Sequence, residues 1–372
     1  MAREPRRLAI VGASVRAAAQ SAVKAGYEVV AADLFADADL RALCHAARIA
    51  DYPHGLADWL AEQSVDAWLF TGALENYPGL VERMQQVLPL LGCGADSLKL
   101  CRDPASLDQN LRPTGVAFPQ TVPWHEAPRG EPGWLAKTYQ HSAGAGVWAL
   151  ETESDFRRAE SSHAWAQRFV RGAPMSAVYA VSREGAALLG VSRQLVGAPL
   201  AHAPRWAYCG SVAPADVGPS VLEKLEELGK LLSASLGLLG LVGVDLVVDD
   251  NEVTLIEINP RFPASVEVLE RAYQQSAVEA HARACRGESI DAWIASEPMP
   301  SAKLILYAER DTIVSNAFSD WAWEQHRAGR MADLPSPGET ISAARPVCTL
   351  FAGDYQGLAE MARETESRLY PE

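Results

Sequence analysis

The chain has 372 residues, more than the usual size of one domain, so two or three folded units are expected. Hydrophobic residues make up 48% of it and charged residues 22%, a composition typical of globular proteins that excludes long disordered or fibrous regions. The net charge of −14 argues against a nucleic-acid partner, and the longest apolar run, residues 236–244, is about half of what a membrane span requires.

The N-terminal region predicts a β–α–β unit that continues with further strands. The predicted elements are strands at 8–12, 27–32, 65–71 and 88–92 and a helix at 16–24. Apolar strands that alternate with a helix indicate a parallel sheet. Residues 1–95 are therefore interpreted as a small parallel α/β unit.

This region also suggests an alternative function. Gly12, Ala13 and Ser14 follow the first strand, and Asp33 lies about twenty residues further on, so the segment partly imitates a dinucleotide-binding fingerprint. The second and third glycines of that fingerprint are absent. A nicotinamide-dependent oxidoreductase is therefore a minor alternative.

A proline-rich stretch at 103–132 indicates a boundary followed by a smaller subdomain. Strands are predicted at 134–137 and 147–150, and between them lies a glycine-containing loop at 142–146. The backbone N–H groups of such a loop can fold over an anion. This part of the chain therefore predicts an anion contact.

The remaining elements are mostly strands. They are predicted at 167–170, 176–181, 187–196, 242–248, 253–258, 303–308 and 346–351, with helices at 221–235 and 358–369. In the predicted helix at 221–235, Ser220 and Glu223 form a capping box. Leucines from Leu222 to Leu232 form an apolar stripe, and Gly237 follows the end of the helix.

Two acidic residues are predicted to face each other across a hairpin. Residues 249–251 are Asp-Asp-Asn, which is typical of a tight turn between the strands on either side. If the hairpin is centred on Asn251, Asp245 lies opposite Glu257. Two carboxylates at this distance repel and destabilise the strand pair, so a compensating cation is expected.

The hairpin predicts a metal site. Asn259 shares the face of Glu257, and the apolar residues point to the other face: Val244, Leu246, Ile256 and Ile258. Asp245, Glu257 and Asn259 would then offer oxygen ligands of the kind that Mg²⁺ prefers. The alternative is that the two carboxylates lie solvated on an exposed sheet face.

The six cysteines have no CxxC spacing, which argues against a zinc site or a disulfide framework and favours a reducing cytoplasmic location.

Three motifs resemble those of the ATP-grasp superfamily. Asp245 followed by Glu-Ile-Asn-Pro-Arg at 257–261 resembles its metal-binding signature. Lys137 with the loop at 142–146 resembles its phosphate-covering lysine and glycine loop, and Gln-Arg-Phe-Val-Arg-Gly at 167–172 resembles its adenine-contacting hinge. The order and spacing of the motifs match, and the similarity is closest to the carboligase-like group related to biotin carboxylase. Other segments that look characteristic of this group lie at 32–39, 208–211, 264–270, 337–338 and 345–348.

The resemblance implies a fold of mixed α/β and α+β class. It implies an N-terminal Rossmann-like domain at 1–95, as the strands also suggest, and an ATP-grasp domain at 96–290 whose smaller lid subdomain spans about 103–165. A small β-rich segment at 291–372 would complete the grasp domain. The resemblance also allows a homodimer, since such proteins are often dimers.

The resemblance assigns roles to individual residues, with ATP and Mg²⁺ or Mn²⁺ as cofactors. The metal would be held by Asp245, Glu257 and Asn259. The ATP contacts would be Lys137, Ser142, Gly144, Gly146, Gln167, Arg168, Phe169 and Val170, with either Lys99 or Arg102 as a second nucleotide contact. Lys137 and Arg261 would be catalytic, Arg261 by stabilising an acyl phosphate or a tetrahedral intermediate. The acceptor pocket would be lined by Arg193, Tyr208, Ser211 and Glu267.

The function that the resemblance implies is that of an ATP-dependent ligase. Such a ligase activates a small-molecule carboxylate as an acyl phosphate and joins it to an amine, here with an association with pterin or furan cofactor biosynthesis. The alternatives are an ATP-dependent carboxylase that uses bicarbonate and a catalytically silent ATP-binding regulatory protein. The partners would be small molecules, with no nucleic acid or membrane.

Overall fold

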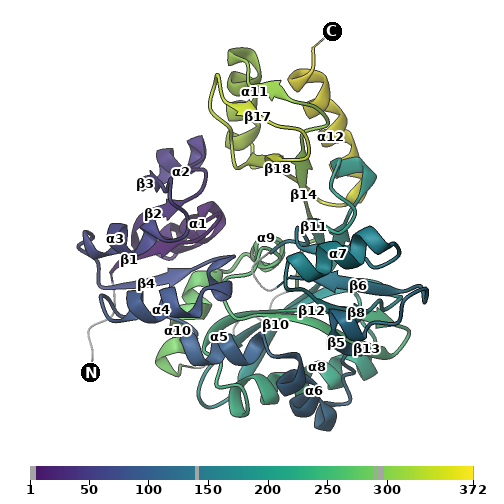
Figure 1. Ribbon diagram of the computed structural model, residues 1–372. Helices are drawn as coiled ribbons and strands as arrows, with labels where there is room; N and C mark the ends of the chain where they lie inside the picture. Colours follow the sequence, from purple (N-terminus) through teal and green to yellow (C-terminus); the bar gives the residue numbers. More distant parts are fainter. Residues whose placement is uncertain (1–5, 139–141, 289, 291–296, 372) are drawn as a thin grey trace.

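The first lobe of the protein is a parallel α/β unit. A computed structural model describes residues 6–138, 142–288, 290 and 297–371, and Figure 1 shows this lobe in purple and dark blue. Its strands pair in parallel in the order β3-β2-β1-β4. The strands are β1 (Arg7–Val11), β2 (Glu28–Asp33), β3 (His45–Arg48) and β4 (Ala67–Phe70). The helices are α1 (Arg16–Lys24), α2 (Ala38–Leu43), α3 (Gly55–Ala61), η1 (Leu74–Asn76) and α4 (Pro78–Gln85).

Most of the predicted elements of this lobe are confirmed, but the strand at 88–92 is wrong. Leu90 forms only an isolated parallel bridge with Trp68. Pro89 has no N–H group to donate to a strand ladder, which explains why the pairing stops there.

Asp33, the acidic residue of the minor nicotinamide alternative, is not placed to bind a cofactor. It is fully buried, and its carboxylate accepts the backbone N–H groups of Val15, Phe35 and Ala36.

Both faces of β1 are buried against the rest of the molecule. Ala9 and Val11 belong to the same hydrophobic core as Val244, whereas Ile10 belongs to a second core with Leu269. Alternate residues of a strand point to opposite faces, so the sheet is covered on both sides. Core residues from either side of residue 95 therefore pack together, and this packing holds the carboxyl end of β1 close to the large sheet.

A small antiparallel sheet forms a second lobe, drawn in teal in Figure 1. Its strands pair in the order β5-β8-β6-β7, and Trp134, Trp148 and Phe156 form its own hydrophobic core. Its elements are β5 (Thr121–Pro123), η3 (Trp124–Glu126), β6 (Trp134–Lys137), β7 (Val147–Ala149), α7 (Glu153–Ser161) and β8 (Trp165–Arg168). It is joined to the first lobe through α5 (Ala95–Cys101), α6 (Pro104–Leu111) and η2 (Arg112–Thr114).

The described residues form a large, eight-stranded antiparallel sheet in the order β13-β12-β9-β10-β11-β14-β18-β16. Its strands are β9 (Ala173–Val181), β10 (Ala186–Val196), β11 (Tyr208–Ala213), β12 (Gly240–Asp249), β13 (Glu252–Asn259), β14 (Ser301–Tyr307), β16 (Met331–Ala332) and β18 (Pro346–Ala352). It is packed with helices η4 (Pro199–Ala201), α8 (Pro219–Ala234), α9 (Val266–Tyr273) and α10 (Ala277–Arg286). The C-terminal strands therefore extend the sheet that carries the predicted hairpin.

The start of helix α8 differs from the predicted one. The helix is capped by Gly218 with Pro219 in its first turn, and no side-chain cap is formed, so the capping box of Ser220 and Glu223 is wrong. Proline suits the first helical turn because that position needs no N–H donor. The predicted apolar stripe is confirmed at Leu225, Leu228 and Leu232, which are buried, but Leu222 is 38% exposed and Val221 is buried instead.

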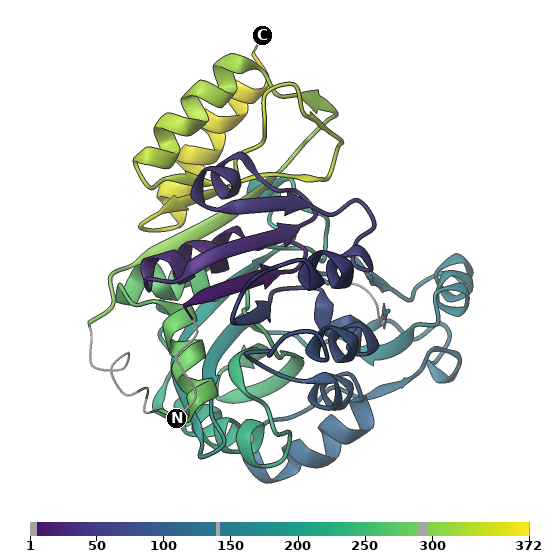
Figure 2. The same cartoon turned by 90° about the vertical axis from the view of Figure 1, so that its left-hand side faces the viewer.

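The C-terminal lobe contains more helix than the sequence predicts. It carries β15 (Thr312–Ile313), α11 (Asn316–Arg327), β17 (Thr340–Ile341) and α12 (Tyr355–Leu369). Helix α11 is missed because the aromatic residues on its buried face, Phe318 and Trp321, are weak helix formers. In Figure 2 this lobe lies beside the purple first lobe, where the Ala38 N–H donates to the Leu334 carbonyl at 2.9 Å. No helix in the described part of the chain is long and apolar enough to cross a membrane.

Candidate active site

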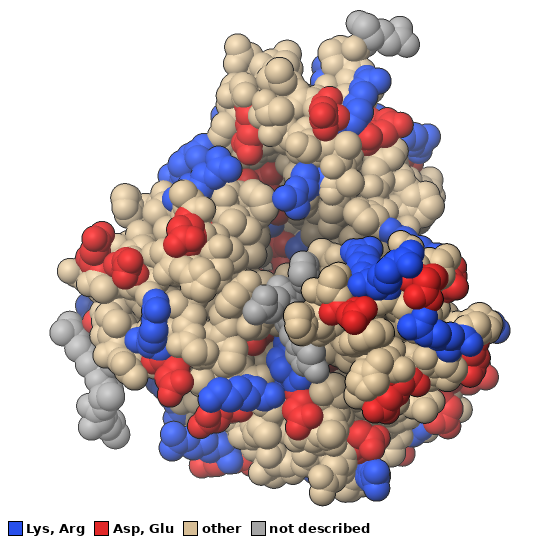
Figure 3. All heavy atoms as spheres, viewed as in Figure 1, with Lys and Arg blue, Asp and Glu red and all other residues tan. Residues whose placement is uncertain are grey.

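A cavity of about 490 Å³ lies where the first lobe, the second lobe and the large sheet meet. Figure 3 shows a hollow between the lobes with acidic and basic atoms at its base. The cavity brings together most of the predicted site residues: Lys137, Ser142, Gly144, Gly146, Gln167, Arg168, Phe169, Val170, Tyr208, Asp245, Glu257, Asn259 and Arg261. These residues come from segments that are far apart in the sequence, so the fold forms the cavity.

The predicted pairing of Asp245 with Glu257 is confirmed, although the hairpin is not centred as predicted. Near the turn, Asp249 pairs with Glu252, which centres the hairpin between residues 250 and 251. The register then shifts between Asp245 and Leu246, where Ile256 is the extra residue of a β-bulge. The bulge restores the opposition of the two carboxylates.

The bulge also changes the surroundings of Ile256. Val244, Leu246 and Ile258 are buried in the core as predicted. Ile256 does not join them, since it is half-buried and lines the cavity beside Glu257. Strict strand alternation predicts that Ile256 points into the core with these residues. The prediction fails because the bulge breaks the period of two.

Asp245 is held by two amide side chains. Gln194 Nε2 donates to its Oδ1 at 2.7 Å, and Asn259 Nδ2 donates to its Oδ2 at 2.9 Å. Burial and the nearby charge of Glu257 nevertheless raise the pKa of Asp245 to about 6. The carboxylate is therefore destabilised in its ionised form unless a further positive charge is present.

Glu257 lies at a more open position, with its side chain 43% exposed, and forms an ion pair with Arg102 at 3.1 Å. Arg102 lines the cavity and also donates to the Ile258 carbonyl and to Asn76 Oδ1. The other candidate for this place, Lys99, is 57% exposed and pairs with Asp96 on its own helix. The structure therefore places Arg102, and not Lys99, in the cavity.

Lys137 lies at the end of β6, where it pairs with Val147 on one side and Trp165 on the other. Burial lowers its pKa, and the charges of Glu257 and Asp245 partly offset this effect. The lysine thus approaches the hairpin carboxylates from the opposite lobe. A half-buried cation of this kind suits an anionic ligand placed between the two lobes.

The glycine-containing loop is packed closely against the large sheet. Gly144 has a φ of +79°, and a Cβ atom there would lie 1.8 Å from the Trp206 carbonyl oxygen. The Trp206 ring also contacts the Phe169 ring edge-on, with 5.9 Å between centroids. Glycine is therefore required at position 144, and the loop and the predicted hinge meet at one tryptophan.

Arg261 lies on the side of the cavity nearest the first lobe. Its Nη2 donates to Asn259 Oδ1 and its Nε donates to Glu75 Oε1, both at 3.0 Å. Burial tends to lower the pKa of Arg261, but the carboxylates of Glu75, Glu257 and Asp245 raise it. The guanidinium group is therefore a fixed positive charge beside the hairpin.

The predicted acceptor residues are divided between several places. Tyr208 lines the cavity and its hydroxyl lies 2.9 Å from Ser211 Oγ, which is buried behind it. Arg193 is exposed and does not line the cavity, so its predicted placement is wrong. The residue next to it, Gln194, lines the cavity instead, because neighbouring strand residues point to opposite faces.

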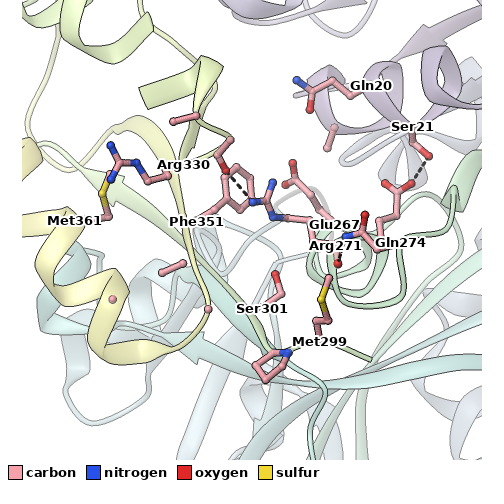
Figure 4. Close-up of a pocket in the computed structure, with 18 of the residues that line it drawn as sticks. Gln20, Ser21, Glu267, Arg271, Gln274, Met299, Ser301, Arg330, Phe351 and Met361 are labelled. Carbon is pink, nitrogen blue, oxygen red and sulfur yellow. Dashed lines mark hydrogen bonds between the residues drawn. The ribbon is translucent and has the colours of Figure 1, made fainter. Parts of the chain in front are cut away.

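Glu267 separates this cavity from a second one of about 860 Å³, shown in Figure 4. It lines the second cavity, between α1, α9 and α12, together with Gln20 and Arg271. Its carboxylate accepts from Arg16 and Lys303, which both line the first cavity. Burial tends to raise the pKa of Glu267, but the charges of Arg16 and Lys303 lower it, and the lowering is the larger effect. Glu267 therefore supports the first cavity from behind and does not face it.

Two further groups at the site are missed from the sequence. Glu75 and Asn76 lie on η1 of the first lobe and contact Arg261 and Arg102, respectively. No motif in the sequence marks them, because their partners are far away along the chain. Gln194, in contrast, could have been found from the strand alternation of β10.

The residues present fit a divalent cation. Among the described residues, no group of three or more His, Cys, Asp and Glu side chains is arranged to hold a metal. The candidate site therefore consists of two facing carboxylates, Asp245 and Glu257, together with the amide of Asn259, whose Oδ1 accepts from Arg261. The raised pKa of Asp245 is the physical sign that positive charge is lacking at its carboxylate. Hard oxygen donors of this kind suit Mg²⁺.

The comparison with known protein families is consistent with this geometry. Residues 101–265 match a family model described as ATP-grasp domain. The chain contains an ATP-grasp domain. A formate-dependent phosphoribosylglycinamide formyltransferase from Janthinobacterium sp. (strain Marseille) is 33% identical over 165 residues, which cover 44% of this chain and 40% of that protein. The matched segment thus spans less than half the length of this relative.

Solved structures extend the ATP-grasp likeness to nearly the whole chain. The L-amino acid ligase from Bacillus licheniformis has a TM-score of 0.72 at 14% identity, covering 99% of this chain and 98% of that one. The biotin carboxylase domain of the Hydrogenobacter thermophilus 2-oxoglutarate carboxylase, in complex with MgADP and bicarbonate, has a TM-score of 0.71 at 14% identity, covering 99% and 91%. The predicted ATP-grasp fold with its N-terminal parallel unit is confirmed.

Proposed function

We propose that this ATP-grasp protein is a Mg²⁺- and ATP-dependent ligase that activates a small carboxylate as an acyl phosphate and joins it to an amine. The observation that supports this proposal is the single cavity that holds Lys137, the Asp245–Glu257 pair and Arg261 together. Positive and negative groups then face one another across a site that lies between two lobes. This arrangement suits a nucleotide triphosphate together with its metal.

In this proposal the second lobe binds the nucleotide. The adenine would lie against the hinge at 167–170 and the ring of Phe169, while the N–H groups of the loop at 142–146 and the ammonium group of Lys137 contact the phosphates. Asp245, Glu257 and Asn259 would hold Mg²⁺. When bound, Mg²⁺ supplies the positive charge that neutralises the phosphate oxygens during transfer.

The reaction would proceed in two displacements. A carboxylate oxygen attacks the γ-phosphorus of ATP, the bond from that phosphorus to the β–γ bridging oxygen breaks, and ADP leaves. The amine nitrogen then attacks the acyl carbon, the bond to the phosphate oxygen breaks, the nitrogen loses a proton and inorganic phosphate leaves. The guanidinium of Arg261 would stabilise the negative charge on the acyl phosphate and on the tetrahedral intermediate.

The carboxylate substrate is proposed to be small. One relative is named as a formate-dependent enzyme, and the family-model match at residues 101–265 includes the hairpin with Asp245 and Glu257. Formate and bicarbonate both fit the proposed chemistry, because each presents a carboxylate oxygen to the γ-phosphorus. The predicted amide-forming and carboxylating activities thus differ only in the acyl group.

The proposal is tested by measuring ADP release and product mass together. The purified protein is incubated with Mg²⁺-ATP and a panel of carboxylates, including formate, bicarbonate and amino acids, each with a panel of amines. We expect ADP formation to require one carboxylate–amine pair and the product mass to equal that of the joined pair. The Glu257→Gln variant serves as the control for contaminating ATPases. ADP binding without turnover on any pair would instead support an ATP-binding regulatory protein.

A further inference from the structure

Glu75 of the first lobe is a buried carboxylate at the edge of the candidate site. It lies on η1 and is 1% exposed. Its Oε1 accepts from Arg261 Nε at 3.0 Å and lies 3.6 Å from Arg102 Nη2. Its Oε2 is buried and has no hydrogen-bond partner among the described residues. Burying a carboxylate oxygen without a hydrogen-bond partner costs free energy, so a buried Glu75 is expected to have a role that offsets this cost.

The two arginines beside Glu75 are also attracted by the carboxylates of the hairpin. Arg102 pairs with Glu257 at 3.1 Å, and the charges of both Glu257 and Asp245 act on Arg261. Arg102 thus already pairs with a hairpin carboxylate, whereas Arg261 is bound to Glu75. If Arg261 were released from Glu75, the charge of Asp245 would attract it toward the place of the proposed metal.

The first lobe packs closely against Arg261. At Gly72, a Cβ atom would lie 3.3 Å from the Arg261 guanidinium carbon, so the backbone of the first lobe approaches the guanidinium closely there. Asn76, next to Glu75, accepts from Arg102 Nε at 2.9 Å. Two neighbouring residues of η1 thus hold two arginines that line the cavity.

We propose that Glu75 is a positioning residue: it holds the guanidinium group of Arg261 against the first lobe, so that the carboxylate of Asp245 stays free to bind a divalent cation. Its effect on turnover depends on the proposed ligase function. Its effect on Arg261 does not, because the competition between Glu75 and Asp245 for this arginine exists in the protein without any ligand.

The first test uses thermal unfolding of the ligand-free protein in a double-mutant cycle. In the wild-type background, Asp245→Asn removes a repelled carboxylate and should raise Tm by a few degrees. In the Glu75→Gln background, Arg261 already compensates Asp245, so Asp245→Asn should no longer raise Tm. The matched control background is Glu62→Gln, which changes an exposed glutamate of the same lobe. In that background, Asp245→Asn should still raise Tm by the full amount. An equal increase in the Glu75→Gln and wild-type backgrounds would overturn the proposal.

The second test measures the Mg²⁺ requirement for ADP binding by isothermal titration calorimetry. Glu75→Gln should raise the Mg²⁺ concentration for half-maximal ADP affinity about tenfold, since a charge-assisted bond then competes with the metal. Glu75→Asp keeps the charge but shortens the side chain, and it should show a smaller shift. If Glu75→Gln does not fold, Glu75→Asp carries both tests, and wild-type values in both would overturn the proposal. Absence of ADP binding in the wild type would count against the proposed function, while the unfolding cycle still decides the role of Glu75.

Discussion

Asp245 lies directly opposite Glu257 because a bulge at Ile256 shifts the register of β12 and β13 by one residue. Without the bulge, the register at the turn would place Asp245 opposite Ile256. The carboxylates instead meet at the floor of the cavity, next to Lys137 and Arg261. A local irregularity in one strand thus decides whether the acidic pair exists.

The proposed metal site predicts that Glu257→Gln removes most ATP turnover without unfolding the protein. The amide cannot supply the negative charge that a divalent cation requires, so kcat should fall roughly a hundredfold or more. ADP release and circular dichroism measure the two effects. Glu252→Gln, at the exposed start of the same strand, should behave like the wild type. Turnover close to that of the wild type in Glu257→Gln would contradict the metal assignment.

The charge of Asp245 is predicted to destabilise the ligand-free protein. Burial and Glu257 raise its pKa from 3.8 to about 6, so the folded state binds the proton more tightly than the unfolded state. Stability therefore falls as pH rises between these two values, and the loss is complete above about pH 6. Asp245→Asn should be more stable than the wild type at pH 8 by on the order of 1–3 kcal/mol, and equally stable at pH 3.5.

Guanidinium-induced unfolding at the two pH values measures this difference, and Asp249→Asn on the same strand is the matched control. An advantage of Asp245→Asn that is larger in acid than at pH 8 would have the wrong sign for a raised pKa. The same variant should lose ATP turnover, so stability and activity are expected to change in opposite directions.

The packed loop predicts that Gly144→Ala weakens ATP binding. Its Cβ would collide with the Trp206 carbonyl oxygen, so the loop could not adopt the observed position. Gly130→Ala is the matched control, because Gly130 has the same φ of +79° but nothing within 4 Å of the added carbon. Calorimetry should show an ATP affinity roughly tenfold lower or more for Gly144→Ala, and no comparable change for Gly130→Ala. Equal affinities for the two variants would show that the observed loop position does not matter for binding.

The positions of the two candidate cations predict different results for Arg102→Gln and Lys99→Gln. Arg102 bridges Glu257, the Ile258 carbonyl and Asn76, so its loss should reduce ATP turnover at least about tenfold and lower stability by about 1–3 kcal/mol. Lys99 forms only an exposed pair with Asp96, so its loss should have no measurable effect. Steady-state kinetics and thermal unfolding distinguish the two. A greater loss of turnover with Lys99→Gln would reverse the assignment.

The sequence predicts those parts of the fold and site that depend on neighbours along the chain. Hydrophobic periodicity identifies β1, α1 and β2, and the hairpin pattern brings Asp245 and Glu257 into opposition. The ATP-grasp resemblance likewise depends on short motifs, and the cavity collects most of the residues in them. These patterns can be detected in a single sequence because strand alternation and turn chemistry involve only a few neighbouring residues.

Only the tertiary structure decides which distant groups meet at the site. Glu75 contacts Arg261 across 186 positions of the chain, and Arg16 contacts Glu267 across 251. No local pattern encodes such a pair, because the two residues meet only after the first lobe packs on the large sheet. The choice of Arg102 over Lys99 has the same origin, because it depends on which side of the helix turns toward the cavity. The chemical groups could therefore be named from the sequence, whereas their arrangement follows from the packing of the lobes.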